Sequence, residues 1–174
     1  MKATALVLLA LLAVPRAAAA ECPCSRADIV VASAAPSLGI DRKRDAYFHL
    51  DLEHEWPLWR GITGGVRGTP AYFARQAVGP GVYGLAFGIF NRMYVDGARH
   101  QGLFGSIGVS TLWSSERFVG NGSRLNFLSH VALGYQVPRQ PWHVALTLEH
   151  TSNAGTVVPN HGVNGLGISV GFSL

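Results

Sequence analysis

Apolar side chains alternate with polar or small ones along short segments of this chain, from residue 27 to the C-terminus. The segment "WHVALTLE", residues 142–149, places Trp, Val, Leu and Leu on one face and His, Ala, Thr and Glu on the other. A period of two residues is typical of a β-strand whose two faces meet different surroundings. After residue 26 no segment follows the helical period, so the alternation restricts the chain to an all-β fold.

Turn sequences such as "VGPG", "DGARHQG" and "PRQP" divide this part of the chain into eight segments of similar length. Eight strands at such spacing predict a single up-and-down β-barrel. The predicted strands cover residues 27–38, 45–56, 60–75, 81–95, 103–114, 123–137, 141–152 and 163–174.

The first twenty residues differ from the rest of the chain. Lys2 precedes a short apolar run at residues 5–15, and three alanines follow where a signal peptidase needs small residues. This order is typical of a secretory signal peptide, and the run is too short to span a membrane. We therefore expect residues 1–20 to be a signal peptide and residues 21–174 to form the barrel domain.

Composition excludes some functions of an exported chain. Without Lys2 and Arg16, twelve basic residues stand against ten acidic ones, and no basic run exceeds three residues, so we expect no nucleic-acid partner. Cys22 and Cys24 would form only a strained disulfide, because one residue separates them. The role of this pair stays open.

The polarity of the strand faces indicates which kind of barrel forms. Residues 164–174 alternate Asn, Leu, Ile, Val, Phe and Leu with glycine and serine only. A soluble, lipocalin-like barrel would have to enclose such large side chains from every strand in a narrow lumen. A membrane barrel turns them toward lipid and keeps small and polar side chains inside. The sequence therefore predicts an eight-stranded antiparallel up-and-down transmembrane β-barrel in the bacterial outer membrane.

The inner face of such a barrel would hold several titratable side chains, which we interpret as a polar plug. Those expected there are His49, Asp51, Glu53, His130, His143 and Glu149. Trp56, Trp59 and Trp142 lie near strand ends, where aromatic girdles occur.

Three polar residues interrupt the outward face near the C-terminus. His150 and Ser152 continue the Trp142–Leu148 face, and Asn164 begins the outward face of the next strand. With both termini in the periplasm, this end of the barrel faces outward, beside the outer leaflet. A histidine that takes the proton of a serine, and a third group that orients the histidine, form an acyl-transfer site. The alternatives are ordinary interface residues and turn chemistry.

The stretch "HTSNAGTVVPNHGVN", residues 150–164, closely resembles the C-terminal signature of the lipid A 3-O-deacylases, the PagL family of outer-membrane barrels. The resemblance includes "LDLEHEWPLW" and "SRLNFLSHVALGYQ" and covers most of the mature chain. It implies an esterase that removes the 3-O-linked hydroxyacyl chain from lipid A of lipopolysaccharide without a metal or other cofactor. His150 and Ser152 match the catalytic pair of the family, and Asn153 and Asn160 match asparagines near its oxyanion site.

Asn164 departs from the family, whose third catalytic residue is a glutamate. An asparagine can accept a hydrogen bond from the imidazole but carries no charge, and the Asp-to-Asn change in a serine protease costs roughly 10⁴ in rate. Glu149 could substitute only if a bulge turned it outward, and His161 could assist from the loop. A second function therefore stays open, a non-catalytic barrel that binds lipopolysaccharide or has a structural role.

The first external loop carries Arg42, Lys43 and Arg44, which could pair with lipopolysaccharide phosphates or lie in solvent. The partners expected are thus lipid A or lipopolysaccharide and the outer membrane. Acyl-chain specificity and a homodimer are left open.

Overall fold

The computed structural model describes residues 26–35, 46–97 and 99–174. These residues form β-strands and no helix, so none of them belongs to a helix that could cross a membrane. The strands are β1 (Arg26–Ala35), β2 (Ala46–Trp59), β3 (Ile62–Arg75), β4 (Val82–Asp96), β5 (Gln101–Ser114), β6 (Leu125–Gln136), β7 (Trp142–Ser152) and β8 (Val163–Ser173). The predicted signal peptide and the Cys22 and Cys24 pair lie outside the described residues.

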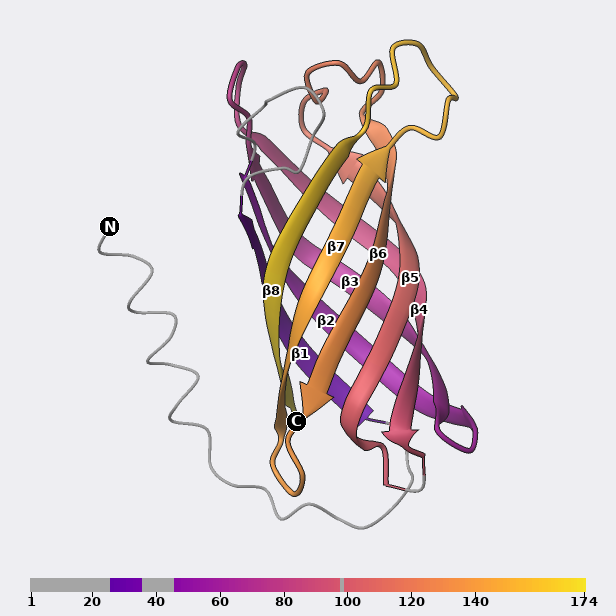
Figure 1. Cartoon of the computed structure of the whole chain (residues 1–174). Helices are drawn as coiled ribbons and strands as arrows, with labels where there is room; N and C mark the ends of the chain where they lie inside the picture. The colour runs from indigo at the N-terminus through magenta and orange to yellow at the C-terminus, as the bar shows by residue number, and fades with distance from the viewer. Residues whose placement is uncertain (1–25, 36–45, 98) are drawn as a thin grey trace, which may run out of the picture.

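Every strand pairs antiparallel with the next one, and β1 pairs with β8, so the sheet closes into a barrel (Figure 1). The β3–β4, β5–β6 and β7–β8 connections lie at one end of the barrel, and the shorter β2–β3, β4–β5 and β6–β7 turns lie at the other (Figure 1). The predicted all-β, antiparallel up-and-down arrangement is confirmed. This topology places β6, β7 and β8 side by side, which positions the predicted catalytic residues.

The two faces of the sheet divide as the alternation predicts. Exposed side chains on the outside of β7 are Trp142, Val144, Leu146 and Leu148, while the glycines and Ser169 of β8 are buried on the inside. Large apolar side chains also cover the outside of β4, β5 and β6. A surface of this composition suits a hydrocarbon solvent.

The predicted end of the second strand at residue 56 is wrong, because β2 continues through Pro57 to Trp59. The register shifts between Pro57 and Trp59 where β2 meets β3. Proline cannot donate to a ladder hydrogen bond and is tolerated at such irregularities. The chain then turns at Arg60 and Gly61, and Gly61 has a φ of 75°.

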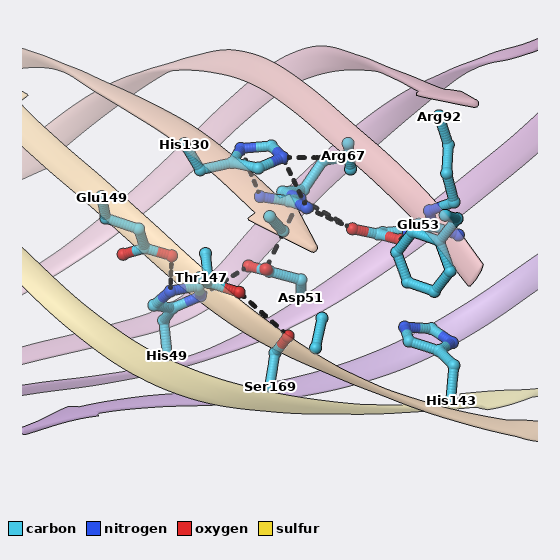
Figure 2. A pocket seen from close by; sticks show the side chains of 14 residues that line it. His49, Asp51, Glu53, Arg67, Arg92, His130, His143, Thr147, Glu149 and Ser169 are labelled. Carbon is cyan, nitrogen blue, oxygen red and sulfur yellow. Dashed lines mark hydrogen bonds and ion pairs between the residues drawn. The ribbon is translucent and has the colours of Figure 1, made fainter. Parts of the chain in front are cut away.

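The lumen holds a buried ion-pair network together with two clusters of buried apolar and aromatic side chains. Glu53 lies between Arg67 and Arg92, with its oxygens 2.5 Å from Arg67 Nη2 and 2.8 Å from Arg92 Nη2 (Figure 2). His49 joins two further carboxylates, with 3.0 Å from Nδ1 to Asp51 and 3.0 Å from Nε2 to Glu149.

All six titratable residues that the alternation places inside are buried there, as predicted. Arg67 and Arg92, which the sequence interpretation does not single out, complete the plug. Their inward register positions on β3 and β4 are the signal that could have identified them.

Candidate active site

Strand pairing aligns three polar residues on the outer surface of the barrel. Ser129 of β6 lies opposite His150 of β7, and His150 lies opposite Asn164 of β8. Residues directly opposite each other project from the same face of a sheet. We call Ser129, His150 and Asn164 the polar row.

Apolar side chains lie on both sides of the polar row along the strands. Val131, Leu148 and Leu166 occupy the next outward positions toward the C-terminal end of the barrel. In the other direction, Phe127 and then Leu125 continue the outward face of β6. The polar row is therefore surrounded by surface suited to lipid, at a depth that lipid acyl chains can reach.

The imidazole of His150 is oriented by Asn164. The distance from His150 Nδ1 to Asn164 Oδ1 is 2.8 Å. An amide oxygen can only accept a hydrogen bond, so Nδ1 carries the proton and Nε2 is left as the basic nitrogen. This is the tautomer that a general base for a serine requires.

Gly162 lies against the other edge of the imidazole. Its φ is 61°, and a Cβ built on it would be 2.7 Å from His150 Cε1 and 3.4 Å from Nε2. The β7–β8 connection thus approaches the ring as closely as a chain without a side chain allows. Asn164 and Gly162 together hold the imidazole from two sides.

Ser152 ends β7 two residues after His150. It lies opposite the outward-facing Phe127, so both serine and histidine belong to the outer face. Its exposed fraction is 9%. Among the described residues, His150 is hydrogen-bonded to Asn164 and Ser129 and not to Ser152.

Asn153 organises the segment that follows the serine. Its side-chain amide nitrogen donates to Asn121 Oδ1 at 2.9 Å and to Val157 O at 2.7 Å, and its Oδ1 accepts Gly155 N–H at 2.9 Å. The side chain is fully buried. An oxyanion role for this amide would therefore require it to give up one of these bonds.

Asn160 is differently placed. Its Oδ1 accepts the backbone N–H of Asn153 at 3.0 Å, and its side chain is exposed. The amide nitrogen of Asn160 forms no hydrogen bond to another described residue, so it can donate to a substrate. Of the two predicted oxyanion donors, Asn160 has the more suitable geometry.

The remaining predicted site residues are not part of the polar row. Arg42, Lys43 and Arg44 lie outside the described residues. Glu149 points into the lumen and binds His49, so it does not turn outward to replace the family glutamate. His161 is exposed on the loop, where its backbone N–H binds Gly120 O. Within the described residues, no group of histidine, cysteine, aspartate and glutamate side chains is arranged to hold a metal ion.

Ser129 is the site residue that sequence reasoning missed. Its hydroxyl donates to His150 O at 3.3 Å. The sequence could have identified Ser129, because it interrupts the otherwise apolar or aromatic outward face of β6. The other outward residues of this strand are Leu125, Phe127, Val131, Leu133 and Tyr135.

A comparison with models of known families identifies the family of the chain. A family model described as lipid A 3-O-deacylase (PagL) matches residues 45–173. The chain belongs to the PagL family. Membership confirms the resemblance carried by residues 150–164 and places the protein in the bacterial outer membrane.

The fold agrees with one solved structure. The outer membrane enzyme PagL aligns with a TM-score of 0.62 at 20% identity, over 84% of this chain and 99% of that one. The outer membrane protein OprG from Pseudomonas aeruginosa aligns with a TM-score of 0.47 at 8% identity, over 86% of this chain and 95% of that one. No curated protein sequence matches the chain. The family model spans β2 to β8 and therefore includes the strands that carry the polar row.

Proposed function

We propose that this PagL-family protein is an outer-membrane esterase that removes the 3-O-linked hydroxyacyl chain from lipid A. The closed barrel spans the membrane, with the β7–β8 connection on the outer side. The observation that carries the proposal is the His150–Asn164 contact of 2.8 Å on the lipid-facing surface, beside Ser152.

The chemistry follows from these positions. His150 Nε2 takes the proton of Ser152, and the serine oxygen attacks the ester carbonyl. The Asn160 amide donates to the charge that develops on the carbonyl oxygen. His150 then returns the proton to the sugar oxygen as the ester bond breaks. Water, deprotonated by the same imidazole, releases the fatty acid from Ser152.

The location of the site selects a lipid ester as substrate. Because apolar side chains lie on both sides of the polar row, the reacting ester must approach laterally, from within the leaflet. An ester at the junction of acyl chain and sugar lies at that depth. Ester hydrolysis by a serine and a histidine needs no metal or other cofactor.

Mass spectrometry of lipid A from cells that express the protein tests the proposal. We expect loss of one hydroxyacyl chain with the wild type and no loss with Ser152→Ala or His150→Ala. Thr111→Ala, which removes an exposed hydroxyl from β5, is the matched control and should retain activity. Unmodified lipid A with a folded wild-type barrel would contradict lipid A deacylation.

A second candidate is a non-catalytic barrel that binds lipopolysaccharide or has a structural role. The absence of a carboxylate at Asn164 favours it, because a neutral partner stabilises an imidazolium less well. A serine-reactive phosphonate separates the two functions. Labelling of the wild type that Ser152→Ala abolishes supports the esterase, and failure to label supports the non-catalytic barrel. The comparisons do not support the possible homodimer.

A further inference from the structure

The loop between β7 and β8 exposes two apolar side chains at its tip. Val158 has an exposed fraction of 89%, and Val157 of 44%. The loop rises from the end of the barrel that also carries the β3–β4 and β5–β6 connections (Figure 1). We call Val157 and Val158 the valine tip. Two adjacent exposed valines on a loop in water would be unfavourable, so their surroundings need an explanation.

The segment that contains the valine tip carries no charged side chain. Aspartate, glutamate, lysine and arginine are absent from residues 150–174. The neighbouring β5–β6 loop, in contrast, contains Glu116, Arg117 and Arg124. Charged groups resist transfer into hydrocarbon, whereas a neutral loop can enter it at much lower cost. The contrast separates a loop suited to water from one suited to lipid.

Polar backbone groups of the loop find partners inside the protein. Asn153 binds Val157 O at 2.7 Å and Pro159 O at 3.3 Å, and Thr156 N–H binds Asn153 O at 3.0 Å. Pro159 O also accepts Gly122 N–H at 2.7 Å. Backbone groups that approach hydrocarbon must be satisfied internally. In the β7–β8 loop, Asn153 and the adjoining β5–β6 loop provide hydrogen-bond partners for several of these backbone groups.

The β5–β6 loop contacts the valine tip close to the start of β6. A Cβ on Gly122 would be 2.9 Å from Val157 Cγ1 and 2.8 Å from Val158 O, so the two loops are in close contact. Leu125 follows three residues later and pairs with Trp113, and both side chains are exposed, at 45% and 66%. The valine tip therefore contacts a residue that lies close in the chain to the end of β6 at which the exposed apolar side chains of the outer face begin.

We propose that the valine tip inserts among the acyl chains of the outer leaflet, next to Asn153, the residue that follows Ser152. Its partner is membrane lipid rather than another protein, because the exposed apolar side chains that begin near it belong to the face that is turned toward the bilayer. Insertion holds acyl chains close to the segment that follows the nucleophile. The contact itself depends on the outer-membrane location and not on catalysis.

An environment-sensitive fluorophore on a single cysteine tests insertion directly. The label is attached to Val158→Cys in the full chain, with Cys22 and Cys24 replaced by serine, and the protein is reconstituted in phospholipid vesicles. The same label on Arg117→Cys, in the charged β5–β6 loop, serves as the aqueous reference. We expect a blue-shifted emission at position 158 that brominated acyl chains quench and aqueous iodide does not. Quenching by iodide and not by brominated chains at position 158 would overturn the proposal.

A second test uses activity and rests on the proposed esterase function. Val158→Asp should lower kcat/KM toward lipid A in vesicles roughly tenfold, because a charge near the interface opposes insertion. Hydrolysis of a short water-soluble ester should be unchanged, and Val158→Leu should retain activity on both substrates. Val78→Asp, at an exposed valine of the β3–β4 loop, is the matched control. An equal loss on both substrates would contradict the proposal. A wild type inactive on every ester would contradict the esterase function and leave the fluorescence result to decide insertion.

Discussion

Asn164 orients the catalytic histidine candidate without supplying a charge. Its oxygen selects the tautomer of His150 with a proton on Nδ1. The amide could equally present its nitrogen after a rotation of the side chain, and that nitrogen would favour the opposite tautomer. A carboxylate has no such alternative and also stabilises the imidazolium that forms during the reaction.

Asn164→Asp should therefore raise the turnover of the proposed esterase reaction. Aspartate has nearly the same shape as asparagine, so the 2.8 Å contact should persist while a negative charge is added. The upper limit of the gain is roughly 10⁴, the loss caused by the reverse change in a serine protease. Turnover of lipid A measures the effect, and Asn164→Leu should lose activity. A slower Asn164→Asp enzyme would show that the site is adapted to a neutral partner.

Gly162→Ala should reduce activity with little effect on the barrel. The added methyl group would meet His150 Cε1 at 2.7 Å, and alanine also tolerates a φ of 61° poorly. The imidazole would be displaced from Asn164, which we expect to lower kcat more than KM. Gly155→Ala is the control, because it has a similar φ of 77° but open space around its Cβ. Equal losses in the two variants would assign the effect to backbone strain alone.

At the scale of strands and loops, the contact between the β5–β6 and β7–β8 connections supports the site. Asn121 links Asn153 to Asn126, with hydrogen bonds of 2.9 and 2.7 Å. All three asparagines are buried. Amide groups in such surroundings are costly to leave unpaired.

Asn121→Ala should loosen the segment that follows Ser152. The change removes one of the three acceptors of the Asn153 amide and leaves Asn126 Oδ1 and the Ser123 backbone N–H without their partner, at about 1–3 kcal/mol for each unpaired buried group. We expect faster proteolysis or hydrogen exchange of residues 153–162 and a lower kcat, while the folded barrel keeps its heat-modifiable migration on a gel. Asn91→Ala, an exposed asparagine on β4, provides the comparison. Unaltered exchange in Asn121→Ala would show that the β5–β6 loop does not brace the site.

The alternation of apolar and polar residues predicts most of the strands. The end of β2 differs from the prediction, because alternation favours a continuing strand there and proline favours a turn. The predicted strand at 141–152 matches β7 within one residue, because each side chain along it meets either lipid or lumen. Proline suggested a turn at residue 57, but the bulge between β2 and β3 accommodates it. The outward positions of His150, Ser152 and Asn164 follow from the same alternation. The Asn121–Asn153 contact does not, because it joins loops through side-chain geometry that no period records.

On the scale of the whole barrel, stability depends on charges in the lumen. Glu53→Gln should destabilise the protein by about 3–5 kcal/mol, because Arg67 and Arg92 would lose a shared buried partner. Urea unfolding in detergent or vesicles measures the change. Glu116→Gln, which breaks the exposed pair with Arg124, should cost less than about 1 kcal/mol. Similar losses would indicate that water reaches the lumen and weakens its ion pairs.

Inward alternation predicts which acidic and histidine side chains enter the lumen, but not how they pair. His49 binds Glu149, one hundred residues later in the sequence. Such a contact exists only once β1 to β8 have closed the sheet, and the relative shift of the strands decides which side chains meet. The arginines of β3 and β4 reach their carboxylates for the same reason.

The outward position of the polar row has a consequence for kinetics. In the proposed reaction, protein and lipid substrate diffuse in the same leaflet, so they meet in two dimensions. The concentration that governs the rate is then the mole fraction of substrate in the surface, not its amount per volume. Diluting the substrate with inert lipid at constant bulk concentration should slow the reaction, and adding buffer to intact membranes should leave it unchanged. A barrel whose site lies in the lumen and takes its substrate from water would slow when buffer is added and would not respond to inert lipid.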